Sequence, residues 1–158
     1  MNTYLPGRIM GIDYGEKWIG IAVSDELRLF AVPLENIERK GDRRVLARLH
    51  EIAEQWQVRE VVLGLPQNMD GTTGRLAGRV ASFAQKLQEA IPLPLHWVDE
   101  RLSSWEAKCL PATKPLFPRP FRKKWDDGLD SKAAAFILQR FLDGERSPAP
   151  VTVQEKRL

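Results

Sequence analysis

The sequence predicts an α/β protein built on one mixed five-stranded sheet, which begins antiparallel, continues parallel and carries helices on both faces. Two observations lead to this fold class. Residues 1–40 contain short apolar runs with no helical repeat between them. After residue 40, apolar runs of strand length alternate with stretches in which apolar residues recur every three to four positions. Strands joined by short turns pair antiparallel, whereas strands joined through a helix pair parallel.

The first three strands are expected over residues 9–12, 18–23 and 30–37. The first two are apolar, and the glycine-containing segment 14–17 between them predicts a β-hairpin. Pro33 lies in the third run and has no N–H to donate to a neighbouring strand. We therefore expect the third strand at an edge of the sheet or with a bulge.

Helices and strands alternate in the rest of the chain. The run 60–64 has no polar alternation, as expected for a strand that is covered on both faces. A threonine is expected to cap the helix that follows it. The remaining elements are expected in this order: helix 43–57, strand 60–64, helix from 72 or 73 to about 90, strand 95–98, helix from 99 to about 110, and helix 130–143.

Composition indicates a soluble globular protein, with 43% hydrophobic and 28% charged residues. The 158 residues are most simply one domain over 1–143, followed by a polar, proline-rich tail over 144–158 that we expect to be flexible. There is no apolar stretch of membrane-spanning length, and the lone Cys109 cannot form an internal disulfide. We expect no signal peptide, because residues 1–4 lack its basic start and apolar core. We expect a cytoplasmic protein with no membrane partner. Because only two histidines accompany that cysteine, any catalysis must rely on carboxylates.

Acidic residues stand where strands end and where the last helix begins. Asp13 ends the first strand, Asp99 and Glu100 end the last strand, and Asp130 begins the final helix. Sites in open α/β sheets gather outside the carboxyl ends of the parallel strands. If the first and last strands are parallel neighbours, these acids can lie together, and three ionised carboxylates then require a cation. Oxygen ligands select Mg²⁺ or Mn²⁺, and two such ions can promote phosphodiester cleavage.

Each acid also has an ordinary structural explanation. Asp13 can be a turn residue of the hairpin. Asp99 can be the N-cap of the helix that follows it, with Glu100 in the first turn of that helix. Asp130 can likewise cap the final helix. Only their joint placement at corresponding ends of the sheet favours a site.

Two further segments suit anions. The loop 64–71 precedes a helix N-terminus, whose free N–H groups can bind an anion, but it lacks the ending of a nucleotide-binding P-loop. The alternative interpretation of this loop is an ordinary connection between a strand and a helix.

The segment 111–125 combines basic, aromatic and proline residues, and it is either a solvated loop or a surface for a phosphate backbone. The net charge of +3 fits a nucleic-acid partner without requiring one.

Four motifs occur in order along the chain. They are Gly11-Ile-Asp-Tyr-Gly15 with Ile19-Gly-Ile-Ala-Val-Ser-Asp25; Gly64-Leu-Pro-Gln-Asn-Met-Asp-Gly71; Asp99-Glu-Arg-Leu-Ser103 with Glu106-Ala107; and Asp130 with Ala133-Ala134 and Ile137-Leu138-Gln139. With these motifs, in this order, the chain resembles the YqgF family, also named RuvX, of bacterial RNase H-like proteins, and the resemblance covers roughly residues 8–143. Ser131-Lys132 departs from the more apolar pair that is usual after the final Asp.

The resemblance implies an RNase H-like fold and a nuclease that uses Mg²⁺ or Mn²⁺. It places Asp13, Glu100 and Asp130 in a catalytic, metal-binding triad, in which Glu100 either binds metal or orients water. It also indicates nucleic-acid contacts, which we expect at Lys17, Asn68, Arg101, Arg122, Lys123 and Lys124. The family is associated with processing the 5′ end of pre-16S rRNA in the cytoplasm, and it has been proposed to resolve Holliday junctions by similarity to RuvC.

The first functional hypothesis is therefore a nuclease that acts on structured RNA, as a monomer or a weak homodimer. A second is a junction resolvase acting on branched DNA, which requires two active sites and hence a symmetric dimer. A third, of another class, is a nucleic-acid-binding module for ribosome assembly with a vestigial site. An ATPase of the actin or sugar-kinase type also begins with such a hairpin, but it normally needs two domains of this kind.

Overall fold

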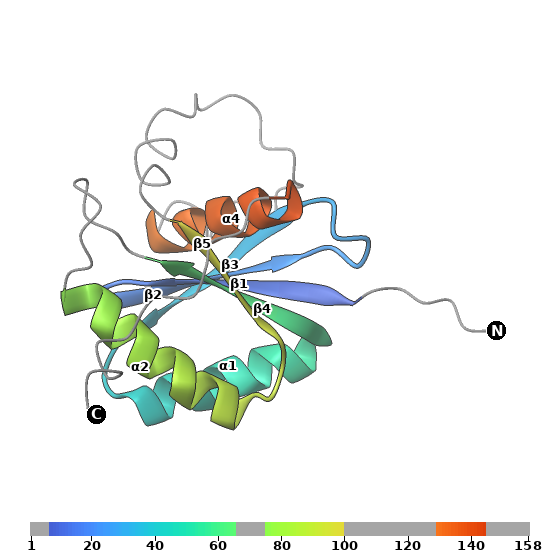
Figure 1. Cartoon of the computed structure of the whole chain (residues 1–158). Helices are drawn as coiled ribbons and strands as arrows, with labels where there is room; N and C mark the ends of the chain where they lie inside the picture. The colour runs from blue at the N-terminus through green and yellow to red at the C-terminus, as the bar shows by residue number, and fades with distance from the viewer. Residues whose placement is uncertain (1–6, 66–74, 100–128, 145–158) are drawn as a thin grey trace, which may run out of the picture.

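The computed structural model describes residues 7–65, 75–99 and 129–144. They form one five-stranded sheet in the order β3-β2-β1-β4-β5, with α1 and α2 on one face and α4 on the other (Figure 1). Strands β1, β2 and β3 pair antiparallel, and β4 pairs parallel with both β1 and β5. The predicted mixed sheet with helices on both faces is confirmed. The elements are β1 (Arg8–Tyr14), β2 (Trp18–Ser24), β3 (Ala31–Glu38), α1 (Asp42–Gln55), β4 (Val58–Leu65), α2 (Arg75–Ala90), β5 (Leu95–Asp99) and α4 (Leu129–Leu142).

The expectation for the third strand is confirmed in both of its forms. β3 is an edge strand, and its pairing with β2 shifts register where Ile21 lies opposite Glu35 and Ala22 lies opposite Pro33. Leu34 is thus the extra residue of a bulge. The threonine cap, the helix over 99–110 and the tail after Gly144 fall outside the described residues. No helix in the described part of the chain combines the length and the apolar character needed to cross a membrane.

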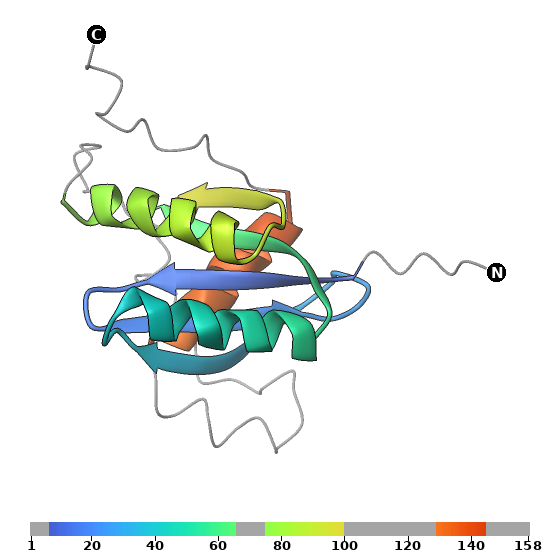
Figure 2. The same cartoon turned by 90° about the horizontal axis from the view of Figure 1, so that it is seen from below.

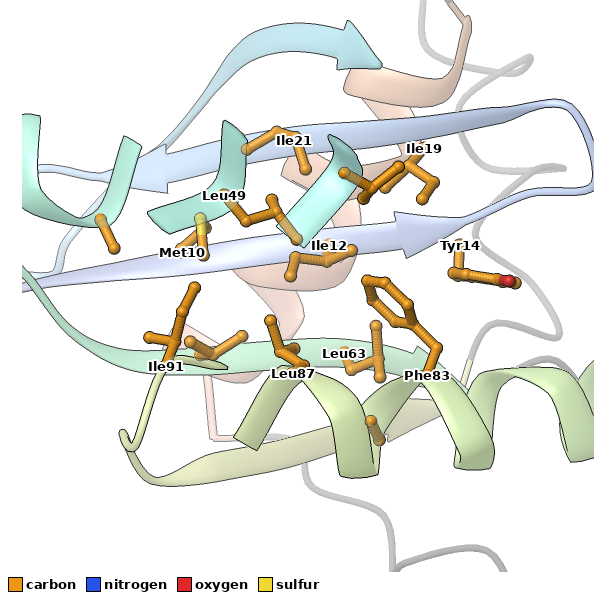
Figure 3. Close-up of a cluster of buried hydrophobic side chains, with 14 of the residues drawn as sticks. Met10, Ile12, Tyr14, Ile19, Ile21, Leu49, Leu63, Phe83, Leu87 and Ile91 are labelled. Atoms are coloured by element: carbon orange, nitrogen blue, oxygen red, sulfur yellow. The ribbon is translucent and has the colours of Figure 1, made fainter. Parts of the chain in front are cut away.

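Alternate residues of β1 face opposite helical layers, as strand geometry requires. Met10, Ile12 and Tyr14 point into the larger core, where they meet side chains of α1 and α2 such as Leu49 and Phe83 (Figure 3). All five are buried, and each aliphatic or aromatic side chain of this kind contributes about 1.5–3 kcal/mol on burial. This core fixes the α1–α2 side of the sheet.

The opposite face of β1 lies against α4 at very short range. Ile9 belongs to the smaller core, together with Ile137 and Leu138 of α4. A Cβ atom on Gly11 would lie 2.7 Å from Cβ of Leu138 and 3.0 Å from the carbonyl oxygen of Ala134. Only a residue without a side chain fits there, so Gly11 sets how closely α4 packs onto the sheet.

At the other end of the hairpin, the carboxylate of Asp25 organises the connection from β2 to β3. It accepts hydrogen bonds from the N–H groups of Leu27 at 3.1 Å, and of Leu29 and Phe30 at 2.7 Å each. Burial of the carboxylate raises its pKa, but these N–H donors outweigh burial and hold the pKa of Asp25 below its usual range.

Replacing Gly11 with alanine should lower the free energy of unfolding by about 1–3 kcal/mol, because α4 must move away from β1. Chemical denaturation measures this change. Gly78→Ala is the matched control: Gly78 lies in α2 with nothing within 4 Å of an added Cβ, so alanine should stabilise by about 0.5–1 kcal/mol. A Gly11→Ala protein as stable as the wild type would contradict the close approach of α4.

Asp25→Asn should destabilise the protein at neutral pH by about 1–2 kcal/mol, because a neutral amide accepts these hydrogen bonds less strongly. The folded-state pKa of Asp25 is depressed, so its contribution is fully present above the ordinary pKa of an unfolded Asp and is lost as the pH falls through the lower, folded-state pKa. Unfolding curves from pH 7 to pH 2 should therefore show the two proteins converging in acid. A constant difference across that range would contradict the assignment.

Candidate active site

Asp13 is the penultimate residue of β1 and lies opposite Gly20 of β2. It is therefore a strand residue, and the alternative that it is a residue of the hairpin turn is wrong. Strand alternation places it on the same face as Ile9 and Gly11, the face that α4 covers. Its side chain is half-buried. A paired strand thus holds this carboxylate at the end of β1.

The first turn of α4 lies at the same end of the sheet. The last turns of α4 meet the opposite end, since Gln139 accepts a hydrogen bond from the N–H of Ala31 at 2.9 Å and donates one to the carbonyl oxygen of Leu29 at 3.1 Å. The helix crosses the sheet diagonally from there (Figure 2). Asp130 is the second residue of α4, inside its first turn and not at the N-cap. The backbone of Asp130 therefore approaches the Asp13 end of the sheet, although its side chain is not among the described ones.

The last strand reaches this end too, but not as a neighbour of β1. β4 lies between β1 and β5, so the first and last strands are not direct neighbours, and the condition under which their acids were expected to meet does not hold in that form. All three strands are parallel, and their carboxyl ends still share one edge. Asp99 is the last residue of β5, and its carbonyl oxygen accepts a hydrogen bond from Arg140 Nη1 at 2.7 Å. Glu100 and the helix that Asp99 was expected to cap fall outside the described residues.

Several predicted site residues cannot be placed. The described ranges do not include Asn68, Arg101, Arg122, Lys123 or Lys124. Within those ranges, no three His, Cys, Asp or Glu side chains gather as a metal site. Of the predicted triad, Asp13 alone has a described side chain. Ser131, which departs from the family pattern, is buried, whereas its neighbour Lys132 is half-buried.

The turn after Asp13 is held by Arg39, a residue that sequence reasoning missed. Arg39 Nη1 donates to the carbonyl oxygen of Gly15 at 3.0 Å, and the backbone N–H of Arg39 donates to the carbonyl oxygen of Lys17 at 2.9 Å. Its guanidinium also lies over the ring of Tyr14, 4.9 Å from the ring centre. One side chain thus contacts the two residues that follow Asp13, while Lys17 remains exposed.

Tyr14 anchors this turn from the core side. Its ring lies 4.8 Å from that of Phe83. Burial raises the pKa of the Tyr14 hydroxyl, and the nearby cations Arg39, Arg79 and Lys86 only partly oppose that rise. Tyr14 is therefore neutral at physiological pH, and it serves as an apolar support next to the candidate site.

Comparison with known families decides the assignment. A family model described as "RuvX: Holliday junction resolvase" matches residues 7–144, nearly the whole chain. The chain belongs to the RuvX family. The family predicted from its four motifs is thereby confirmed.

Curated relatives are similar to this chain over most of their length. A protein of Syntrophomonas wolfei named "Putative pre-16S rRNA nuclease" is 44% identical over 137 residues, which cover 87% of this chain and 94% of the relative. Relatives with the same name from Thermoanaerobacter pseudethanolicus and a Synechococcus strain are 36% and 40% identical, over 89% and 88% of this chain and 99% and 91% of the relatives.

Among solved structures, RuvC of T. thermophilus shares the fold. The structure described as RuvC in complex with Holliday junction substrate aligns with a TM-score of 0.53 at 17% identity, over 90% of this chain and 99% of RuvC. A second T. thermophilus RuvC structure gives the same TM-score at 14% identity. At this identity the likeness concerns the fold alone, and it confirms the RNase H-like architecture.

Replacing Arg39 with lysine keeps the charge but removes the planar guanidinium that stacks on Tyr14 and donates to Gly15. We expect local opening of the turn to become easier by about 1–2 kcal/mol. Hydrogen exchange measures this at the Gly15 amide, which donates to the Trp18 carbonyl oxygen at 3.0 Å. Arg43→Lys should leave the Gly15 amide unchanged, because Arg43 is an exposed residue of α1. Equal exchange in both variants would exclude this role for Arg39.

Proposed function

We propose that this member of the RuvX family is a metal-dependent nuclease that hydrolyses phosphodiester bonds, and that it processes the 5′ end of pre-16S rRNA. One observation carries the proposal: Asp13 is a half-buried carboxylate at the end of β1, on the face where α4 brings its first turn, with Asp130, to the same edge. The shared name of the curated relatives supports rRNA as the substrate.

The donor set fits a hard cation. We propose that Asp13, Glu100 and Asp130 hold Mg²⁺ or Mn²⁺, because all three supply carboxylate oxygens. Bound there, the metal would activate water and stabilise the leaving oxygen of the cleaved bond. Glu100 directly follows the last residue of β5, and β5 ends at the same edge as β1.

The protein contributes rigidity at the reacting position. Asp13 belongs to a strand that pairs with both β2 and β4, and the next residue, Tyr14, is buried in the larger core. A carboxylate held in this way loses little conformational freedom when substrate binds, which favours catalysis through fixed geometry.

Lys17 is exposed three residues beyond β1, and we propose that it contacts a substrate phosphate. Asn68, Arg101, Arg122, Lys123 and Lys124 are proposed as further nucleic-acid contacts.

Holliday junction resolution is the second candidate, and the description of the matching family model favours it. Symmetric cleavage of a junction requires two sites and therefore a dimer. We propose a monomer or weak homodimer in the cytoplasm, where precursor rRNA is processed. Sedimentation of the protein with and without a four-way junction distinguishes the two roles, since a strictly monomeric complex would reject the resolvase. Binding of RNA without any metal-dependent cleavage would favour the third hypothesis, a non-catalytic assembly module.

Asp13→Asn should reduce metal-dependent cleavage at least about 100-fold while leaving the fold intact, because the amide keeps the shape of the carboxylate but not its charge. Cleavage with Mg²⁺ is measured on a precursor-rRNA leader, single-stranded RNA, single-stranded DNA and a four-way junction.

The matched control is Asp143→Asn. Asp143 is an exposed acid after the last turn of α4, at the opposite end of that helix, and its loss should leave cleavage unchanged. Thermal unfolding of both variants checks their folds. Cleavage by a folded Asp13→Asn protein at the wild-type rate would reject the assigned site.

A further inference from the structure

The two ends of the sheet differ in how their cations are neutralised. At the end where β1 starts, Arg8 lies 3.5 Å from the carboxylate of Glu26, and Arg28 lies 2.9 Å from that of Glu60, whereas the exposed Arg59 has no such pair among the described residues. At the Asp13 end, four exposed cations have no carboxylate within ion-pair distance among the described residues. They are Lys17, Arg43, Arg44 and Arg79.

These four cations come from three segments that meet at one corner. Lys17 lies in the turn between β1 and β2, Arg43 and Arg44 follow the first residue of α1, and Arg79 lies near the start of α2. Figure 2 shows α1 and α2 side by side, both beginning at the end of the sheet that carries the β1–β2 turn. The carboxylate of Asp42 joins the two helices through an ion pair with Lys86 at 2.7 Å.

Contacts within the corner confirm the proximity. Arg39 hydrogen-bonds to Lys17 through the backbone and precedes α1 by three residues. Arg79 lies close enough to Tyr14 to act on its hydroxyl, as Arg39 does. The acids of the corner are largely engaged, since Glu38 pairs with Lys40 at 3.4 Å and Asp42 pairs with Lys86, while Glu16 is exposed.

We propose that Lys17, Arg43, Arg44 and Arg79 form a phosphate-binding strip, which holds the backbone of a nucleic acid on the α1–α2 side as the strand passes Asp13. The proposal rests on the proposed function, because it assigns the strip to the substrate of that site. Cations without acidic partners can replace the counterions of a phosphate backbone, and their release drives binding without regard to base sequence. The N-terminus of α1 has no side-chain cap, and its dipole adds positive potential at the same place.

The strip is tested by equilibrium binding in EDTA, so that no cleavage occurs, to a labelled RNA hairpin and a labelled four-way DNA junction over a range of salt concentrations. The double variant Lys17→Gln, Arg43→Gln should weaken binding about tenfold. The negative slope of log K against log salt should become less steep by about 2, because two phosphate contacts are lost. Equal losses on both probes identify the shared phosphate backbone as the ligand, and a loss on one probe alone assigns the strip to that nucleic acid.

Arg59→Gln is the control, since Arg59 is an exposed arginine near the start of β4, at the opposite end of the sheet. Its binding and salt slope should match those of the wild type. The strip is rejected if the double variant binds both probes with wild-type affinity and slope. It is also rejected if Arg59→Gln loses as much affinity as the double variant does. Binding in EDTA does not depend on cleavage, so a failed strip and an inactive Asp13 site are separate results.

Discussion

The packing of α4 onto β1 at Gly11 is the constraint on which the arrangement of the site depends. The missing side chain lets the backbone of α4, at Ala134, approach the strand almost to contact distance. That approach fixes the height of the helix above the sheet and leaves its first turn at the edge where β1 ends. A bulkier residue two positions before Asp13 would lift the helix and separate the two elements that the proposed function needs together.

The fold was predictable because its determinants are local. Apolar runs and helical stripes mark the described elements, and Pro33 predicts that the third strand lies at an edge or carries a bulge. Strand order was not predictable, because the apolar run of β4 encodes burial on two faces but not which strands lie beside it. The sequence places Asp13 at the end of the first strand, but the apolar run stops at Ile12, whereas ladder pairing with Gly20 extends the strand past the acid.

In the candidate site, too, the residues marked by a local motif were predictable, whereas those whose role depends on tertiary contacts were not. Asp13 was identified from its motif, but Arg39 was not, since its role depends on contacts with a turn more than twenty residues earlier. Lys17 was expected as a nucleic-acid contact, but Arg43 and Arg79 were not, because they are far from it along the sequence and only the folded chain brings their segments to one corner. Charge runs such as 122–124 attract notice in a sequence, whereas a surface assembled from single cations does not.

The bulge in β3 bears on how two copies of this chain could associate. An exposed edge strand normally offers unpaired N–H and carbonyl groups to another chain, but Pro33 lacks the donor and the bulge at Leu34 breaks the regular spacing of the others. A continuous sheet shared through β3 is therefore disfavoured. A symmetric pair that places two sites on one branched substrate is therefore expected to meet through another surface.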